Sequence, residues 1–377
     1  MKTILQICFW LSISVLLSNC RNEESKFSVV DLEKANTPMD VNINEIASSW
    51  QIIPLETSEK ALLGDFLRCW VSDKYIVIAD DQAIYQFDSE GRFVRKLANQ
   101  GKGPNEFSFI GETDGDASLE RFYFVDARHA ERGIQSIDLI NGTFRQPLLA
   151  YGNCAFKVLA DHNLAVIPTK SADGLGVISP EGKVVWEVSG IRQVPEKYAM
   201  FPYFEGISEG ILYKKEESDT VFLWREGKEK PWCFLQVDRP FRASGISGNT
   251  VMPVWCTSSQ LFVRVTDQKI VDIAGMKLRM PVDKKNPYVR YLIDRKNESV
   301  RQVGRWYVES WDCYLLRSFE PVRKGNYIYA VLNAVEIKKI IADKQEAGEK
   351  LTEELQKLNA QLKEEDNPVI FVGKVKG

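Results

Sequence analysis

The stretch from Tyr75 to Phe107, YIVIADDQAIYQFDSEGRFVRKLANQGKGPNEF, decides the fold of this chain. It contains three runs of β-branched and aromatic residues. A turn at Asp80-Asp81 separates the first run from the second, and a Ser89-Glu90-Gly91 turn separates the second from the third. Short apolar runs divided by turn residues are typical of strands joined by hairpins. The stretch therefore predicts an antiparallel β-meander.

The meander ends in GKGPNEF, whose Gly101 and Gly103 raise the question of a phosphate-binding loop. Such a loop needs a helix directly behind its glycines, because the helix N-terminus supplies free N–H groups. Here Pro104 follows at once, and the next residues show no helical period. We interpret the segment as a turn between sheets, in which the glycines supply backbone freedom and Phe107 is packed. Lining of a channel mouth is its alternative role.

Similar strand cores recur along the chain. They begin at Tyr75, Phe122, Leu164, Ile211 and Leu261, at spacings of 47, 42, 47 and 50 residues, and again at Leu315 or Tyr327. A period of about 40 to 50 residues with several strands per unit is the blade size of a β-propeller, and a sandwich does not explain it. The sequence predicts an all-β, six-bladed β-propeller over residues 46–377.

The two ends of this region predict how the ring closes. SSWQIIPLET at 48–57 and NPVIFVGKVK at 367–376 are strand-like and lie outside the complete units. An open ring would expose sheet edges, so we expect these segments to pair in the last blade. Before the last strand, residues 335–365 predict one amphipathic helix with leucines at 351, 355, 358 and 362. We expect this helix to pack against the propeller, with a coiled-coil dimer as the alternative.

The N-terminus predicts export. Residues 1–19 have the form of a signal peptide, and Leu17-Ser18-Asn19-Cys20 resembles the bacterial lipobox, in which the cysteine is lipidated. Residues 20–45 then read as the lipidated cysteine and a flexible tether. Glu23-Glu24 fit a signal for the outer membrane. We expect an outer-membrane lipoprotein on the periplasmic or cell-surface face, with an ordinary signal peptide as the alternative.

Composition and charge narrow the class of protein. With 44% hydrophobic and 27% charged residues the chain is typical of a folded globular protein. Its net charge is −3 and it has no basic run, so we expect no nucleic-acid partner. We expect a monomer that contacts the membrane only through its lipid. Five scattered cysteines outside the signal and the lipobox form no C-x-x-C pair, and one disulfide among them is possible: Cys69, Cys154, Cys233, Cys256 and Cys313.

Several motifs resemble those of the six-bladed β-propeller lipoproteins of bacteria, which are akin to NHL-repeat and TolB-like propellers. Their signature is a strand pair followed by Gly-x-Gly-Pro-Gly-Glu-Phe/Tyr. Gly101, Gly103, Pro104, Glu106 and Phe107 match it, and Asn105 replaces the usual glycine. SWQIIPLET, ESDTVF and EEDNPVIFVGKVK are further matches. The resemblance implies the fold and no particular activity.

No catalytic motif stands out. His129 and His162 are the two histidines, and no H-E-x-x-H, G-x-S-x-G or C-x-x-C occurs. No cofactor is evident; calcium is conceivable, but no D-x-D-x-D-G loop supports it. A carboxylate pair for glycoside chemistry is left open among five aspartates, which more often cap turns: Asp65, Asp80, Asp81, Asp126 and Asp219.

Two functional hypotheses remain. The first is a binding or scaffold propeller for a glycan, a peptide or a partner protein, with ligand-binding candidates Tyr203, Phe204, Trp255 and His129. Nine tryptophans favour it, although most are expected between blades. The second is an enzyme, a lyase or hydrolase that uses carboxylates or histidine at the channel mouth. Catalytic residues are not identified, and no metal site is expected.

Overall fold

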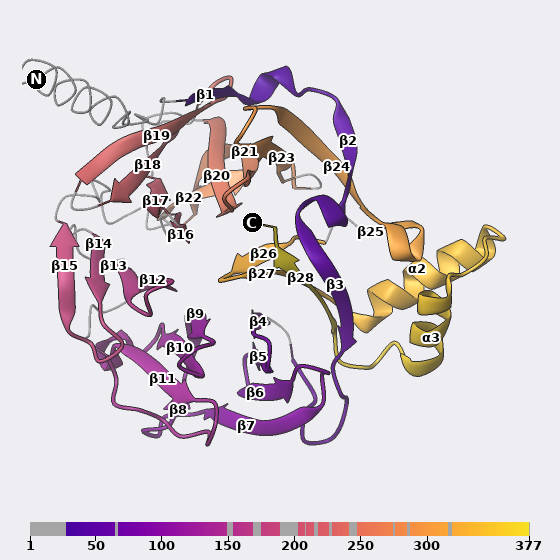
Figure 1. The fold of residues 1–377 in the computed structure, drawn as a ribbon, viewed down its shortest axis with the longest axis horizontal. Coiled ribbons are helices and arrows are strands. Elements are labelled where there is room, and N and C mark those ends of the chain that lie inside the picture. Colours follow the sequence, from indigo (N-terminus) through magenta and orange to yellow (C-terminus); the bar gives the residue numbers. More distant parts are fainter. Residues whose placement is uncertain are drawn as a thin grey trace, which may run out of the picture.

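A computed structural model describes most of the chain: residues 28–64, 67–148, 154–168, 175–188, 203–207, 209–214, 218–225, 228–240, 247–273, 276–284, 287–315 and 319–376. The strands of these segments form six sheets, which stand side by side around a common axis (Figure 1). In each sheet one strand lies next to the axis and the following strands step outward. The fold is a β-propeller, as the sequence predicts.

The quoted meander forms the first blade. Its strands are β4 (Arg68–Val71), β5 (Tyr75–Ala79), β6 (Ala83–Asp88), β7 (Phe93–Gln100) and β8 (Glu106–Phe107). The first four are antiparallel to their neighbours, and β8 pairs in parallel with β7. Asp80 ends the first hairpin by accepting the backbone N–H groups of Gln82 and Ala83. The expected turn chemistry is therefore confirmed in this blade.

The other predicted cores also lie in central strands of their sheets. The second sheet is β9 (Ile110–Asp116), β10 (Arg121–Asp126) and β11 (Ile134–Asp138), and the third is β12 (Cys154–Val158), β13 (Leu164–Pro168), β14 (Leu175–Ile178) and β15 (Val184–Val188). The fourth contains β16 (Phe204–Ile207), β17 (Gly210–Lys214), β18 (Thr220–Arg225) and β19 (Lys228–Gln236). The fifth contains β20 (Ser247–Cys256), β21 (Gln260–Ile273), β22 (Met276–Pro281), β23 (Val289–Asp294), β24 (Val300–Val308) and β25 (Cys313–Leu315).

The prediction of six full blades is wrong in one place. Five sheets have four or more strands, but the β9–β11 sheet has three. Residues 144–148 lie where its outer strand would be and make only isolated bridges, at Phe144 and Leu148. Pro147 stands between them and has no N–H group to donate to a ladder. The structure therefore has five complete blades.

The last sheet closes the ring with both ends of the predicted region. Its order is β26 (Val322–Lys324), β27 (Tyr327–Leu332), β28 (Val369–Val375) and β3 (Ala47–Pro54). Antiparallel pairing of β28 with β3 joins segments more than 300 residues apart in the sequence. The predicted closure is confirmed.

The expected tether over residues 20–45 is wrong for its described part. Strand β1 (Ser28–Asp31) pairs in parallel with β19, and β2 (Pro38–Asn42) pairs in parallel with β24. Leu32, Val41 and Ile43 between and after them are buried. The segment therefore covers the outer edges of two blades before it enters β3, along the upper right of Figure 1. The tether was predicted because residues 21–28 are mostly polar and charged.

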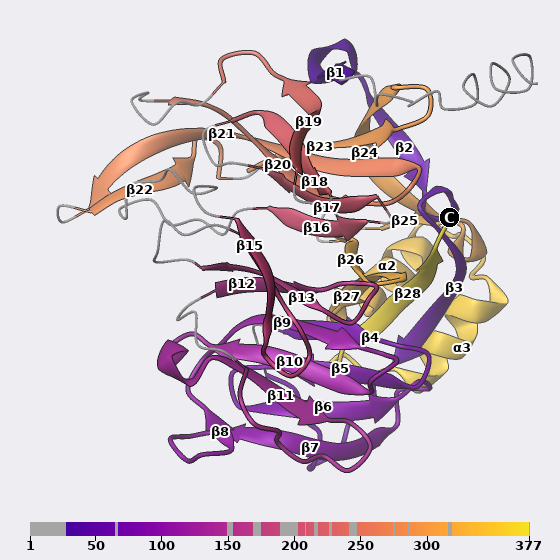
Figure 2. The same ribbon diagram turned by 60° about the vertical axis from the view of Figure 1, so that its left-hand side comes forward.

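The single predicted helix is two helices, α2 (Ala334–Glu346) and α3 (Glu353–Gln361). Gly348 has a φ of +73°, which ends the first, and the Thr352 side chain caps the second. Both pack on the outside of the ring (Figure 2). Their buried face includes Ile337, Ile341 and Leu355, which belong to one apolar cluster with the closing sheet. Packing against the propeller is thus confirmed.

Six apolar clusters fill the described core, each between two neighbouring sheets. The five cysteines outside the N-terminal segment are buried free thiols within or beside these clusters. Burial raises the pKa of the Cys154 and Cys256 thiols to about 12. They serve as small apolar side chains.

Candidate functional site at the ring axis

Six ionisable side chains meet at the centre of the ring, and we call them the axial cluster. They come from the innermost strands β9, β12, β16 and β26 (Figure 1). The cluster has three carboxylates and three cations: Glu112, Asp114, Glu205, Lys157, Arg323 and Lys324. Charged side chains are rarely buried unless they are paired or used. Here the six come from four separate sheets.

Strand β26 supplies two of the cations and sends them in opposite directions. The Arg323 guanidinium lies 3.3 Å from the Glu205 carboxylate and donates to the carbonyl oxygens of Gly206 and Cys256, at 3.2 and 2.7 Å. The Lys324 ammonium instead donates to the Thr113 carbonyl. These contacts tie the closing sheet to three other sheets across the axis.

Lys157 is different. Its side-chain ammonium makes no hydrogen bond or ion pair with any residue that the structure describes, although it lies among the charges of the cluster. Burial disfavours its ammonium form, but the attraction of Glu205, Glu112 and Asp114 outweighs burial and raises the Lys157 pKa. The side chain is therefore a charged, half-buried donor without a direct protein partner.

Two neighbours of Lys157 are shifted toward their neutral forms. Burial raises the pKa of Glu205 against the opposing effects of Lys157 and Arg323. Burial and then repulsion by Lys157 lower the pKa of Lys324. Asp114 is held differently, because its carboxylate accepts the N–H groups of Gly115 and Val158, both at 2.9 Å. The ring centre thus contains charges that protein contacts satisfy only in part.

Tyr203 borders the cluster. Its hydroxyl oxygen is buried and has no hydrogen-bond partner among the described residues. Burial, followed by the fields of Cys256 and Glu205, raises the Tyr203 pKa. Tyr203 precedes Glu205 by two positions in the chain. An unsatisfied buried hydroxyl is costly unless a water or a ligand completes it. Within the described residues of the site, the Tyr203 hydroxyl and the Lys157 ammonium are the two polar groups without a direct hydrogen-bond partner.

Comparison with known proteins gives the chain a family. The profile of a domain of unknown function, DUF4934, matches residues 27–374, nearly the whole chain. The chain belongs to the DUF4934 family. No curated protein matches it.

One solved structure supports the fold of this DUF4934 chain. A predicted exported protein from Bacteroides fragilis NCTC 9343 is 15% identical, with a TM-score of 0.59, over 93% of this chain and 100% of that one. A DUF4221 member from Bacteroides vulgatus ATCC 8482 is 9% identical, with a TM-score of 0.46, over 87% and 97% of the two chains. At such identities the first likeness shows the shared architecture alone.

The four ligand-binding candidates lie in different parts of the structure. Trp255 is fully buried, stacks on Phe262 with ring centroids 5.2 Å apart and donates to the Pro321 carbonyl, so it offers no stacking surface. His129 lies away from the axis in a loop and contacts Glu131 at 3.1 Å. Phe204 begins β16 next to Tyr203. Only the Tyr203–Phe204 segment reaches the axial cluster.

The predicted carboxylates do not converge in the described part of the chain. Asp80 caps its hairpin, and Asp126 accepts the N–H groups of Ser108, Phe109 and Arg128. Asp65 lies outside the described residues. The carboxylates that do converge, Glu112, Asp114 and Glu205, were missed. Alternation of Glu112 with Asp114 on an expected strand was the available signal.

His162 contacts a carboxylate that is buried, whereas the Glu131 partner of His129 is exposed. The His162 Nδ1 lies 2.8 Å from the Asp116 carboxylate, which also accepts the N–H groups of Ser118 and Leu119. His162 has a φ of +69° in a tight turn. The pair joins the β9 and β12 blades at the end of the strand that carries Asp114. The contact between His162 and Asp116 stabilises this turn, in agreement with the prediction from the sequence that His162 is a turn residue.

The GKGPNEF segment connects the first two sheets, as predicted, but for another reason. Gly101 and Gly103 are not among the positive-φ residues, and neither is Asn105. A Cβ on Gly101 would instead lie 2.0 Å from the Glu106 carboxylate, which accepts the Gly103 N–H at 2.7 Å. Phe107 is fully buried in the cluster between the first two sheets. Close approach of Glu106 requires the glycines.

Two absences are confined to the described residues. No three His, Cys, Asp or Glu side chains there lie close enough to hold a metal ion. None of the helices in that part of the chain is long and apolar enough to cross a membrane. The segment with the expected signal peptide and Cys20 lies outside the described residues.

Proposed function

We propose that this protein is an exported binding module that holds a small polar ligand with an anionic group at the axial cluster. The observation that carries the proposal is the Lys157 ammonium, which stays charged at the ring centre without a direct partner in the described structure. The buried Tyr203 hydroxyl, which has no hydrogen-bond partner among the described residues and lies two positions before Glu205, is the second candidate donor. A carboxylate of a peptide terminus or of an acidic sugar matches both groups.

Glu112 and Asp114 explain why the ligand is polar as well as anionic. Together with Glu205, which has the larger effect, they keep Lys157 charged. The three carboxylates of the axial cluster balance its three cations, so net charge does not attract anions to the site. A ligand must place its anionic group on Lys157 and donate hydrogen bonds to the surrounding carboxylates. Peptides and glycans both provide such donors, and binding of either is consistent with a scaffold that has no catalytic motif.

The test is a binding titration with two probes, triglycine and trigalacturonic acid, on the full chain. We expect one probe to bind, and Lys157→Met to weaken it by tenfold or more, roughly the loss of one charge-assisted hydrogen bond. Lys357→Met is the matched control, because Lys357 is exposed on α3. Equal affinity of the Lys157→Met variant would contradict the proposal. Mass spectrometry of the recovered probe tests the enzyme hypothesis, which predicts cleavage.

We also propose that Cys20 carries a lipid that anchors the protein to the outer membrane. Cys20 precedes Ser28, the first described residue, by eight positions, so an extended linker spans at most about 28 Å. The anchor would therefore hold the outer edge of the fourth sheet, where β1 pairs, near the membrane. Cys20→Ala is expected to release the chain from the membrane fraction, whereas Cys69→Ala is not.

A further inference from the structure

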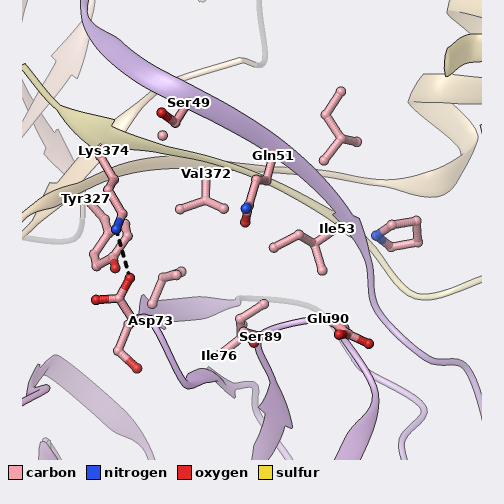
Figure 3. Close-up of a pocket in the computed structure, with 15 residues that line it drawn as sticks. Ser49, Gln51, Ile53, Asp73, Ile76, Ser89, Glu90, Tyr327, Val372 and Lys374 are labelled. Carbon is pink, nitrogen blue, oxygen red and sulfur yellow. Dashed lines mark ion pairs between the residues drawn. The ribbon is translucent and has the colours of Figure 1, made fainter.

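A second candidate site lies in the seam where the ring closes, and none of the six residues of the axial cluster lines it. Between the closing sheet and the first blade the structure has a half-open cavity of about 650 Å³. We call it the seam groove (Figure 3). The argument uses six of its lining residues: Gln51, Ile53, Asp73, Ile76, Tyr327 and Lys374. The volume is typical of sites for small molecules.

Charges at the two ends of the seam groove are compensated. At one end the Lys374 ammonium lies 3.0 Å from the Asp73 carboxylate, and the Tyr327 hydroxyl donates to the same carboxylate. The Tyr327 hydrogen bond and then that of Lys374 lower the Asp73 pKa, so Asp73 remains an acceptor. At the other end Glu90 pairs with Arg92 at 2.5 Å. The groove therefore selects no net charge.

Between these ends the groove combines an aliphatic floor with uncommitted polar groups. Ile53, Ile76 and Val372 are buried beneath it. The Gln51 side chain projects into the space from β3, as Figure 3 shows, and its amide has no hydrogen bond within the described residues. The exposed Ser89 hydroxyl stands opposite, on the β6–β7 turn.

A local distortion of β3 shapes this edge. Ser49 has a φ of +55°, and the pairing of β3 with β28 shifts between Val372 and Lys374. Gly373 allows Trp50 to approach, because a Cβ there would lie 2.9 Å from the Trp50 ring. Bulges of this kind re-aim side chains and are frequent beside functional sites.

We propose that the seam groove binds a short, uncharged oligosaccharide. Sugar hydroxyls donate to the Asp73 carboxylate and accept from Lys374 and the Gln51 amide, while the C–H faces of the rings cover the aliphatic floor. A peptide fits less well. The polar groups that the groove offers, on Gln51, Asp73 and Lys374, are side-chain groups, whereas strand addition would bind a peptide through backbone hydrogen bonds along the edge strand β3.

The experiment titrates the full chain with maltotriose, cellotriose and mannotriose and measures binding by calorimetry. We expect at least one trisaccharide to bind, and Gln51→Ala and Asp73→Asn each to weaken it about tenfold, as the loss of one hydrogen bond to a charged or amide partner implies. Gln345→Ala is the matched control, because Gln345 is exposed on α2. Thermal unfolding of each variant checks that it is folded.

The proposal is overturned if no trisaccharide binds the wild-type chain, if the two groove variants bind like the control, or if triglycine alone competes for the groove. Lys157→Met separates this site from the ring centre. It leaves trisaccharide binding unchanged if the groove is an independent site, and a loss of binding in this variant would assign the trisaccharide to the axial cluster instead.

Discussion

The seams between the sheets and the centre of the ring are built in opposite ways. Each seam contains an apolar cluster, such as the one in which Phe371 of β28 packs edge-on against Trp311 and Phe319. The centre is a set of charges from four sheets, of which Arg323 and Lys324 are satisfied by contacts across the axis. The seams therefore hold the sheets together through apolar packing, and the centre connects them through charged side chains. Four measurements test this difference between the seams and the centre.

Truncation in a seam is expected to have the largest effect. Phe371→Ala removes a fully buried ring at the closure strand, and we expect it to lower the free energy of unfolding by about 4 kcal/mol. Denaturant unfolding measures the change. Phe109→Ala is the control, because Phe109 is 47% exposed. Equal losses from the two variants would show that closure does not depend on this seam.

Breaking the centre is expected to cost less. Arg323→Met leaves the buried Glu205 carboxylate unpaired, and we expect a loss of about 3 kcal/mol. The double variant Arg323→Met/Glu205→Gln should recover part of it. Arg305→Met breaks an exposed pair with Asp40 and should cost at most about 1 kcal/mol. Equal losses of unfolding free energy from Arg323→Met and Arg305→Met would show that the ion pair at the centre is no more shielded from solvent than the exposed pair.

The turn into the second sheet has a smaller, local effect. Gly101→Ala forces the Glu106 carboxylate away from the Gly103 N–H, and we expect a loss of about 1 to 2 kcal/mol in unfolding experiments. In the Glu106→Ala background the same substitution should cost much less, because no carboxylate remains to be displaced. Additive losses would place the strain elsewhere.

The smallest effect is a pH dependence. The folded-state pKa of Glu205 is raised above its unfolded value, so its contribution to stability is present at low pH and is lost as pH rises through the folded pKa. The wild type should therefore lose stability relative to Glu205→Gln as pH increases from acidic to neutral. Urea unfolding over that range measures the difference. A constant difference would mean that Glu205 is not desolvated.

The seams were largely predictable from the sequence and the centre was not. Strand cores such as Phe122 and Leu164 repeat locally, and their spacing predicts a propeller with closure by β3 and β28. The charges of the centre are separated by up to about two hundred positions, and no local pattern pairs Glu112 with Lys324. The missing outer strand around Pro147 and the helix break at Gly348 each depend on a single residue within a regular pattern. Trp255 was predicted to lie on a ligand-binding surface, because tryptophan is common both in such surfaces and in buried cores.

Crystals of the full chain soaked with triglycine or trigalacturonic acid test the central claim most directly, because the electron density locates the bound carboxylate. The account predicts a ligand carboxylate within hydrogen-bond distance of the Lys157 ammonium, and its absence in Lys157→Met crystals. A carboxylate oxygen of the chain bonded to Lys157, with no density for either probe there, would contradict it.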